Sequence, residues 1–386
     1  MDLDDKISKI VKEFRPSGIR AFFDIVATRE DCISLGVGEP DFISPQPVLE
    51  SAVDAIRDGF THYTGNQGLL SLRKEICNYL ENEYQLNYDF EKEVLITVGV
   101  SQGLDIALRS VINAGDEVIY CSPSYVSYEP LIKLSGGTAV AISTNVENKF
   151  KITPEQLEQA CTNKTKAILL NFPCNPTGAS YSHHELEKLA VVIEKHNILV
   201  ISDEIYADLT YDSVHTPISA IKWMKERTLI LGGFSKGFAM TGWRIGYICG
   251  PEVWVNAVTK IHQYSMLCAP TISQIAAESA LKNATHDKDL MKASYHERRN
   301  LICDGFNKIG LRTHIPEGAF YVFPEIKSTK YNSMDFATAL LEQKNVAVVP
   351  GTAFGPEGEG YIRCSYATSL DEIKIALERI EEFILP

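Results

Sequence analysis

The chain has 386 residues and is acidic: 37 lysines and arginines stand against 50 aspartates and glutamates, a formal net charge of −13. Such a surface repels phosphate backbones, so the composition speaks against nucleic-acid and anionic-membrane partners. The length exceeds what one hydrophobic core usually spans and predicts two domains. Nine dispersed cysteines without a CxxC pair favour free thiols in a reducing cytoplasm. No apolar run approaches a membrane span or a signal core.

In chain order, residues 1–15 are predicted to form an N-terminal arm, and the strand-like sequence CISLGVGEPDF follows at 32–42. From about residue 47 to residue 282, short apolar runs alternate with stretches of helical apolar spacing. This alternation predicts an α/β fold with a mostly parallel sheet covered by helices on both faces. The seven predicted strands are 93–100, 116–123, 137–144, 166–173, 198–205, 228–235 and 245–250.

The last third of the chain mixes helical stretches with short strands and predicts a smaller α+β domain. Its predicted helices are 288–309, 334–344 and 369–383, and its strand candidates are AFYVFPEI, VAVVP and YIRCSYA. We expect the N-terminal segment to complete this domain. The predicted division is therefore 16–46 with 283–386 for the small domain, and 47–282 for the large one.

Polar side chains follow the C-terminal ends of several predicted strands, where ligands bind in parallel sheets. Each has an ordinary structural explanation when taken alone. Ser101 at a helix start reads as an N-cap, the NPTG sequence at 175–178 as a turn, and a lone lysine as a surface group. The set as a whole comprises Ser101, Gln102, Tyr125, Asn171, Asn175, Asp203, Tyr206, Ser235, Lys236 and Arg244.

Together these residues match the chemistry of a pyridine cofactor that carries a phosphate. Lys236, between small residues at the mouth of the sheet, is suited to lose its proton and form a Schiff base. A buried Asp203 opposite the ring nitrogen would keep that nitrogen protonated. The helix start at Ser101 and the guanidinium of Arg244 suit a phosphate. Groups that could stack on the ring or bind its phenolic oxygen are Tyr125, Tyr206 and Asn175.

The sequence resembles the class I and II aminotransferases, which have the aspartate-aminotransferase fold, fold type I of the pyridoxal-phosphate enzymes. Six motifs carry the resemblance in order: GVGEPDF, HYTGNQG, NPTG, SDEIY, SKGFAMTGWRIG and YIRCSYA. They span nearly the whole chain. The resemblance implies pyridoxal 5′-phosphate as cofactor, a large domain with a mostly parallel seven-stranded sheet between helices, and a smaller α+β domain. It implies no metal.

The resemblance also implies a role for each matching residue. Lys236 would hold the cofactor and carry a proton during catalysis, Asp203 would pair with the ring nitrogen, and Tyr206 with Asn175 would bind the ring oxygen. Tyr125 would stack on the ring. The phosphate would be held by the segment that contains Val100, Ser101 and Gln102, together with Ser235 and Arg244.

The implied substrates are an L-amino acid, aromatic, aspartate or similar, and a 2-oxo acid such as 2-oxoglutarate. Arg363 would clamp the substrate carboxylate in a bidentate manner, next to the backbone of Gly38, with Tyr125 and Asn175 close by. Tyr63 would reach the phosphate of a neighbouring subunit, which implies a homodimer with shared active sites.

Alternative functions are judged by the motifs they need. A zinc hydrolase would want HExxH, which is absent from the sequence, and a nicotinamide dehydrogenase would want GxGxxG between a strand and a helix. A carbon–sulfur beta-lyase of the same fold stays open, because it uses the same lysine and aspartate. Val100, Ser101, Gly65 and Gln67 depart from the residues common in relatives, and the last two are expected to border the substrate entrance.

Overall fold

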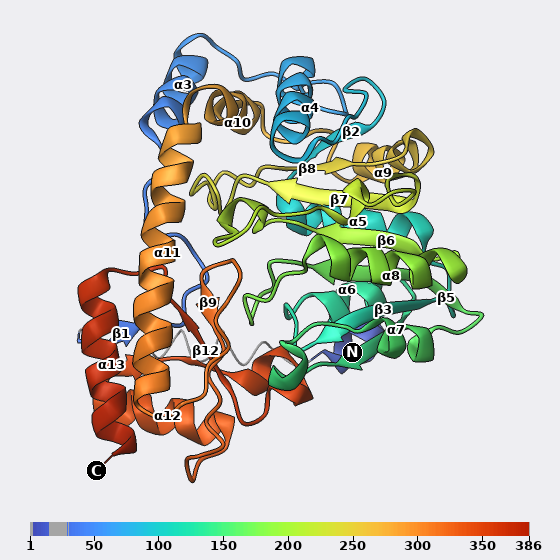
Figure 1. The fold of residues 1–386 in the computed structure, drawn as a ribbon. Coiled ribbons are helices and arrows are strands. Elements are labelled where there is room, and N and C mark those ends of the chain that lie inside the picture. The colour runs from blue at the N-terminus through green and yellow to red at the C-terminus, as the bar shows by residue number, and fades with distance from the viewer. Residues whose placement is uncertain (1–2, 15–28, 30, 386) are drawn as a thin grey trace.

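The computed structural model describes residues 3–14, 29 and 31–385. A seven-stranded sheet with helices on both faces forms the larger part of the molecule, and the last third of the chain packs beside it (Figure 1). The strand order is β2-β8-β7-β6-β5-β3-β4. Neighbouring strands are parallel except at β8, which runs antiparallel to both β2 and β7. The predicted mostly parallel, seven-stranded sheet is confirmed.

Each strand coincides with one of the predicted apolar runs but is shorter by a few residues. Most of the lost residues are at the C-terminal end, because there the chain leaves the sheet and enters a polar loop. Strand β4 is the most exposed, as expected of an edge. The strands are β2 Val94–Thr97, β3 Glu117–Ser122, β4 Thr138–Ser143, β5 Thr165–Asn171, β6 Leu199–Asp203, β7 Thr228–Gly233 and β8 Gly246–Cys249.

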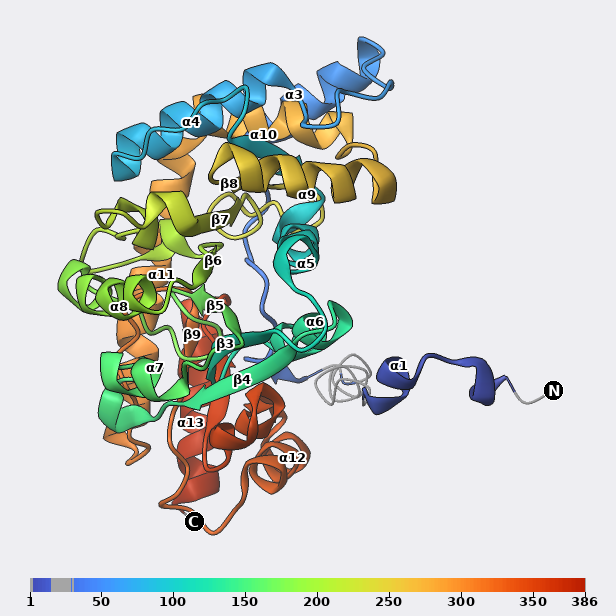
Figure 2. The same cartoon turned by 90° about the vertical axis from the view of Figure 1, so that its right-hand side faces the viewer.

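Helices cover the sheet in two layers that pack around separate apolar cores. Helices α5 (Gly99–Val111), α6 (Tyr128–Leu134) and α9 (Glu252–Ser265) cover one face, and α7 (Pro154–Ala160) and α8 (His183–Lys195) cover the other (Figure 2). Three more helices pack near the β2–β8 end of the sheet. These are α3 Gln46–Arg57, α4 Leu70–Tyr84 and α10 Thr271–Asn283.

The starts of these helices differ in a way that matters for the site. Helices α7 and α8 begin with capping boxes, in which Thr153 with Gln156 and Ser182 with Glu185 satisfy backbone N–H groups reciprocally. Helix α5 begins at Val98 and Gly99 without a hydrogen bond from a capping side chain. Its first N–H groups are therefore free to receive an external anion.

The C-terminal part is built on the 24-residue helix α11 (Thr285–Lys308), which runs along both parts of the molecule (Figure 1). Helices α12 (Ser333–Lys344) and α13 (Leu370–Ile384) pack with α11 and share its apolar core. The observed helix ends lie within three residues of the predicted ones. A three-stranded antiparallel sheet, in the order β11-β12-β9, consists of β11 Val349–Pro350, β12 Ile362–Ser365 and β9 Tyr321–Val322.

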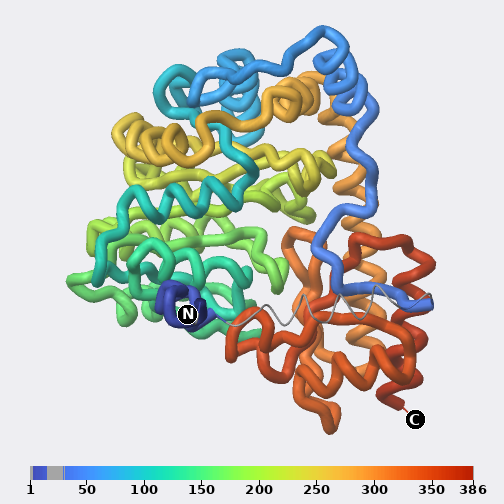
Figure 3. The backbone as a smooth tube through the Cα atoms, turned by 180° about the vertical axis from the view of Figure 1, so that it is seen from behind, coloured from blue at the N-terminus to red at the C-terminus, as the bar shows by residue number. Residues whose placement is uncertain are grey.

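The N-terminal segment joins this part through β1 (Ile33–Ser34), which pairs in parallel with β10 (Val346–Ala347). The predicted strand VAVVP is thus split between two sheets. From β1 the chain runs along one side of the molecule to α3 (Figure 3), and this crossing brings Gly38 to the cavity described below. The predicted domain limits at 46/47 and 282/283 stay a prediction, since the shared helix α11 crosses between the two parts.

The predicted N-terminal arm is only partly described. Its helical turns η1 (Asp4–Lys6) and α1 (Lys9–Glu13) stand out from the main body (Figure 2), while residues 1–2, 15–28 and 30 lie outside the described residues. Among the described helices, none has the length and apolarity needed to cross a membrane. The remaining short helical turns are η2 Val146–Asn148, η3 Ala207–Leu209, η4 Ile218–Ala220, η5 Lys225–Arg227, η6 Gly351–Phe354 and η7 Pro356–Gly358.

Candidate active site

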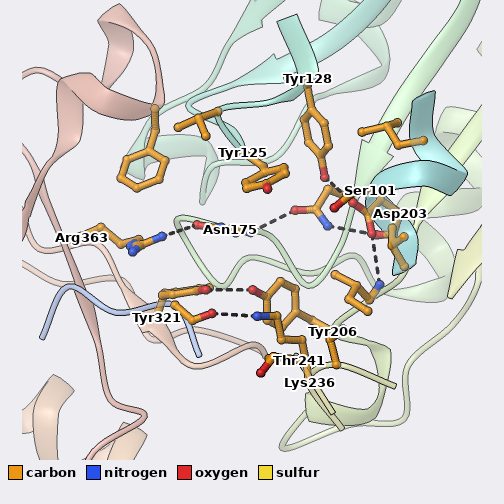
Figure 4. Close-up of a pocket in the computed structure, with 18 of the residues that line it drawn as sticks. Ser101, Tyr125, Tyr128, Asn175, Asp203, Tyr206, Lys236, Thr241, Tyr321 and Arg363 are labelled. Carbon is orange, nitrogen blue, oxygen red and sulfur yellow. Dashed lines mark hydrogen bonds between the residues drawn. The ribbon is translucent and has the colours of Figure 1, made fainter. Parts of the chain in front are cut away.

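A cavity of about 570 Å³ opens where the parallel strands end, between the large sheet and the C-terminal strands (Figure 4). Its position follows from the rule that parallel strands present their C-terminal ends to ligands. The structure brings together at its wall all of the predicted site residues except Tyr63 and Gln102. Those at the wall are Gly38, Val100, Ser101, Tyr125, Asn175, Asp203, Tyr206, Ser235, Lys236, Arg244 and Arg363.

Lys236 follows strand β7 and lines the cavity, with its Nζ 5.9 and 5.6 Å from the ring centroids of Tyr206 and Phe320. Its Nζ donates a hydrogen bond of 2.7 Å to the carbonyl oxygen of Gly38. Burial lowers the pKa of Lys236 to about 8, while the nearby carboxylate of Glu39 opposes that change. A sizeable fraction of the amine is therefore neutral near physiological pH, which is the state that attacks a carbonyl.

Asp203 ends strand β6 and is buried at the opposite side of the cavity. Its Oδ2 accepts a hydrogen bond of 2.8 Å from the hydroxyl of Tyr128, and its Oδ1 accepts one of 3.3 Å from the N–H of Ile205. Burial raises the pKa of Asp203 to about 6, and these two hydrogen bonds oppose the rise. A cation placed against this carboxyl group would bring it back to the ionised state.

Arg363 faces the cavity from strand β12, opposite the large sheet. It donates a hydrogen bond of 3.0 Å to Oδ1 of Asn175 (Figure 4). A second hydrogen bond, of 2.6 Å, goes to the carbonyl oxygen of Gly36. The guanidinium lies between the rings of Tyr321 and Phe354, at 4.4 and 4.9 Å from their centroids. Its buried Nε has no hydrogen-bond partner among the described residues, so the group retains a donor for a ligand.

Tyr206 adds a hydroxyl between Lys236 and the C-terminal strands. This hydroxyl lies 2.8 Å from the hydroxyl of Tyr321, and the two rings meet edge to face with centroids 5.7 Å apart. Burial raises the pKa of Tyr206, so its hydroxyl is protonated at neutral pH and can donate. A Cβ at Gly38 would lie 2.6 Å from the hydroxyl of Tyr321, so only a glycine leaves that tyrosine its position.

The start of α5 provides a cradle for an anion. Gly99 has φ +68°, and a Cβ there would lie 2.9 Å from Nη2 of Arg244, so the guanidinium approaches the helix start closely because the residue is a glycine. The hydroxyls of Ser101 and Ser235 line the same side of the cavity. A helix N-terminus with free N–H groups, an arginine and two hydroxyls is suited to a phosphate.

These observations fit the cofactor expected from the sequence, pyridoxal 5′-phosphate. The cradle at α5 suits its phosphate, the buried carboxyl of Asp203 suits a protonated ring nitrogen, and the amine of Lys236 suits its aldehyde. Asn175 and Tyr206 line the same cavity, and their side chains have the N–H and O–H groups that the ring oxygen would need as donors.

Two predicted residues are not at the cavity wall. The side chain of Gln102 turns back along α5, where its Oε1 accepts a hydrogen bond of 2.7 Å from the N–H of Val98, and its Nε2 lies 2.9 Å from Nδ1 of His262. The structure therefore gives the Gln102 side chain no direct contact with the cavity, because helical side chains point toward the N-terminus. Tyr63 is 81% exposed and stands outside the cavity of its own chain.

The wall also contains residues for which the sequence predicts no role. Asn171 is predicted only as a residue at a strand end. In the structure its side-chain amide donates to the carbonyl oxygen of Asp203 over 3.0 Å. Tyr128 lies three positions after Tyr125 in CSPSYVSY, and nothing in that motif distinguishes which tyrosine meets Asp203. The other missed residues are Leu104, Val126, Ile205, Thr241, Tyr321 and Phe354.

Comparison with known proteins gives concordant matches along the chain. The family model for aminotransferases of class I and II matches residues 30–380. The Bacillus subtilis protein YugH, named as an aminotransferase, is 51% identical over 98% of both chains. The aspartate aminotransferase of Pyrococcus abyssi is 41% identical over 100% of this chain and 98% of its own. The crystal structure of the aromatic aminotransferase from Pyrococcus horikoshii superposes with a TM-score of 0.90 at 39% identity, covering 95% of this chain and 98% of the other.

The environment of Lys236 predicts its reactivity in the cofactor-free protein. Only the neutral amine is acylated, so labelling of Lys236 should rise with pH around a midpoint of about 8. Replacing Glu39 by Gln should move the midpoint lower, because a nearby negative charge is removed. Competitive labelling with trace acetic anhydride, read by peptide mass spectrometry, measures both midpoints. A wild-type midpoint at about 10 or above, as for an ordinary lysine, would contradict this account of the site.

Proposed function

The chain belongs to the class I and II aminotransferases, and from this premise we propose how its residues divide the work of the reaction. The enzyme is pyridoxal-phosphate-dependent and transfers amino groups between amino acids and 2-oxo acids. The observation that supports the residue assignment is the pairing, in one cavity, of a buried amine with a pKa of about 8 and a buried carboxyl with a pKa of about 6. The cavity needs both because the reaction moves a proton while charge develops on a ring.

Lys236 is proposed as the proton carrier. When bound, pyridoxal phosphate supplies a ring that accepts negative charge from the α-carbon of the substrate. The neutral Nζ of Lys236 would take the proton from the α-carbon of the substrate, and the ammonium group so formed would hold that proton until it is returned. Gly38 supports this role, since its carbonyl oxygen holds Nζ in place without a fixed charge.

The other groups orient the reactants. The carboxyl group of Asp203, which accepts a hydrogen bond from the hydroxyl of Tyr128, would pair with the ring nitrogen and keep it protonated. The hydroxyl of Tyr206 and the amide of Asn175 would bind the ring oxygen. Arg363 binds the α-carboxylate, for which its planar fork is suited. The cradle at the start of α5 fixes the phosphate, so that the reacting atoms keep their places through two half-reactions.

The proposed donors are aromatic amino acids or aspartate, and the proposed acceptor is 2-oxoglutarate. Two of the relatives named above support this range, since they are named as an aspartate and an aromatic aminotransferase. The wall of the cavity supports the aromatic end of the range, because Val126, Ile205, Tyr321 and Phe354 give it extensive apolar and aromatic surface.

The proposal predicts alternating half-reactions that depend on Lys236. Initial rates with a panel of amino donors and 2-oxoglutarate should give parallel double-reciprocal lines, the pattern of ping-pong kinetics. Lys236→Ala should lose about 10³-fold or more in kcat, with an unchanged circular dichroism spectrum and retained cofactor binding. Release of pyruvate and ammonia from cystathionine without an acceptor, in place of transamination, would reject the proposal in favour of a beta-lyase.

Arg363→Lys should weaken substrate binding more than it slows the chemistry, because an ammonium cannot form two parallel hydrogen bonds to a carboxylate. Charge-assisted hydrogen bonds contribute about 1.5–3 kcal/mol, so KM for the donor should rise roughly ten- to hundredfold. Arg312→Lys is the matched control: Arg312 is 59% exposed and forms only a surface ion pair with Glu147. Unchanged KM values for every donor in the Arg363 variant would argue against the clamp.

We propose further that two copies form a homodimer with shared active sites. The segment that carries Tyr63 is tied to residues 264–271, since Asn66 donates to the carbonyl oxygen of Leu267 and Thr271 donates to that of His62. Tyr63, Tyr264 and Met266 are 81%, 90% and 50% exposed. Such an apolar area is typical of an interface, and a second copy would place Tyr63 at the cradle of its neighbour.

Complementation tests this arrangement. A heterodimer of one Lys236→Ala chain and one Tyr63→Ala chain, isolated with two affinity tags, would contain one site with both native residues. Its activity should be about half that of the wild-type dimer, far above either parent. Activity equal to the mean of the two parents would show that each chain uses its own Tyr63, or none.

A cytoplasmic location is proposed on the strength of the cysteines. All nine are free thiols, as expected in a reducing compartment. Recovery of the protein in the periplasmic or secreted fraction of its host would contradict this assignment.

A further inference from the structure

Gln102 and His262 form a bridge between helices α5 and α9 next to the phosphate cradle. The N–H of Val98, the residue before the first turn of α5, donates to Oε1 of Gln102 over 2.7 Å. The Nε2 of the same amide lies 2.9 Å from Nδ1 of His262. His262 is 0% exposed, on the buried face of α9. Neither residue lines the cavity, so the bridge supports the cradle from outside it.

The backbone N–H of Val98 fixes the direction of both hydrogen bonds in the bridge. A backbone N–H can only donate, so the oxygen of the Gln102 amide faces Val98 and its NH₂ faces His262. Nδ1 of His262 must then accept, which requires a neutral imidazole with its hydrogen on Nε2. Burial lowers the pKa of His262 and favours this neutral form, while the backbone of Asn66 beside the ring opposes the shift. The chain Val98, Gln102 and His262 is therefore a single connected unit.

The start of α5 has only half of the capping seen in α7 and α8, because its N-cap residue, Val98, has no side-chain oxygen to receive a backbone N–H. No capping side chain bonds to the N–H groups of Gly99, Val100 or Ser101, in contrast to the capping boxes of α7 and α8. On one side this turn rests on Gly246 of β8, where a Cβ would lie 2.9 Å from the backbone of Gly99 and Val100. The bridge adds a second anchor, from α9. It does not use the N–H groups of Gly99, Val100 and Ser101, which stay available to a ligand.

We propose that Gln102 and His262 are positioning residues for the cofactor phosphate. They hold the start of α5 so that its backbone N–H groups keep the direction in which they receive the phosphate, and neither touches the phosphate itself. The inference rests on the proposed function to the extent that the phosphate binds at α5. It assigns a role to His262, and it replaces the direct phosphate contact expected for Gln102 by an indirect one.

Binding of two ligands to the full-length, cofactor-free chain tests the proposal. Dissociation constants for pyridoxal 5′-phosphate and for pyridoxal, which lacks the phosphate, are measured by quenching of tryptophan fluorescence. Gln102→Leu and His262→Leu should each weaken pyridoxal phosphate binding about five- to thirtyfold and pyridoxal binding less than about twofold, the range expected for one hydrogen bond that positions a binding group. The double variant should bind no more weakly than the weaker single variant, because both remove the same bridge.

Two further variants separate positioning from general damage. His262→Asn places an amide oxygen near the position of Nδ1 and should restore binding to within about threefold of wild type. Gln156→Leu removes the same kind of helix-start hydrogen bond from α7, far from the cavity, and should leave both constants unchanged. If leucine at position 102 prevents folding, Gln102→Asn keeps an amide but makes it too short to bridge, and the same loss is expected.

The outcomes distinguish the bridge from the function on which it rests. A wild-type chain that binds pyridoxal as tightly as its phosphate would overturn the phosphate site at α5, and the inference with it. A wild-type preference for the phosphate that survives unchanged in the variants would overturn only the bridge. Equal weakening of both ligands would also overturn it, since it would show that the residues maintain the cavity as a whole.

Discussion

Two ionisable groups of opposite charge are buried in one cavity, and each is hydrogen-bonded to a neutral partner rather than to the other. Lys236 donates to the carbonyl oxygen of Gly38, and Asp203 accepts from the hydroxyl of Tyr128. Burial without an ion pair disfavours the charged form of both groups, which lowers the pKa of the lysine and raises that of the aspartate. The rest of the proposed mechanism depends on this separation, because a direct ion pair would hold Lys236 and Asp203 in their charged forms and engage them with each other.

The sheet is the element that maintains the separation. Asp203 ends β6 and Lys236 follows the adjacent strand β7, and the parallel pairing of Asp203 with Leu231 fixes their relative register. The two side chains cannot move into water or into contact with each other, because both strands are anchored in close-packed apolar layers on the two faces of the sheet. The free energy of packing in these layers thus compensates for the cost of burying Lys236 and Asp203.

The start of α5 is likewise a locally unfavourable feature that the surrounding structure holds in place. Helices α7 and α8 satisfy their first N–H groups with their own side chains, whereas α5 leaves its first turn open to the cavity and is held from the side by β8 and by the Gln102–His262 bridge. The cavity is completed by the C-terminal part, whose Arg363 donates to Asn175, in the loop that follows β5, over 3.0 Å. The site is therefore shared between two parts that the chain connects through α11 and through the crossing segment at Gly38.

Local patterns in the sequence were sufficient to predict the alternation of buried strands and helices, the seven strands of the large sheet, the helices of the C-terminal part and most of the polar residues at the strand ends. These features follow from local rules, since periodicity and strand-end chemistry act within a few residues. Three contacts could be found only in the folded molecule: Tyr128 rather than Tyr125 meets Asp203, Tyr321 and Phe354 enclose Arg363, and Gln102 turns to His262 instead of the cavity. Asp203 contacts Tyr128, which is 75 positions away, and Arg363 contacts Tyr321 and Phe354, which are 42 and 9 positions away. Gln102 contacts His262, 160 positions away. No local pattern encodes these neighbours, because packing and not sequence spacing selects the partner.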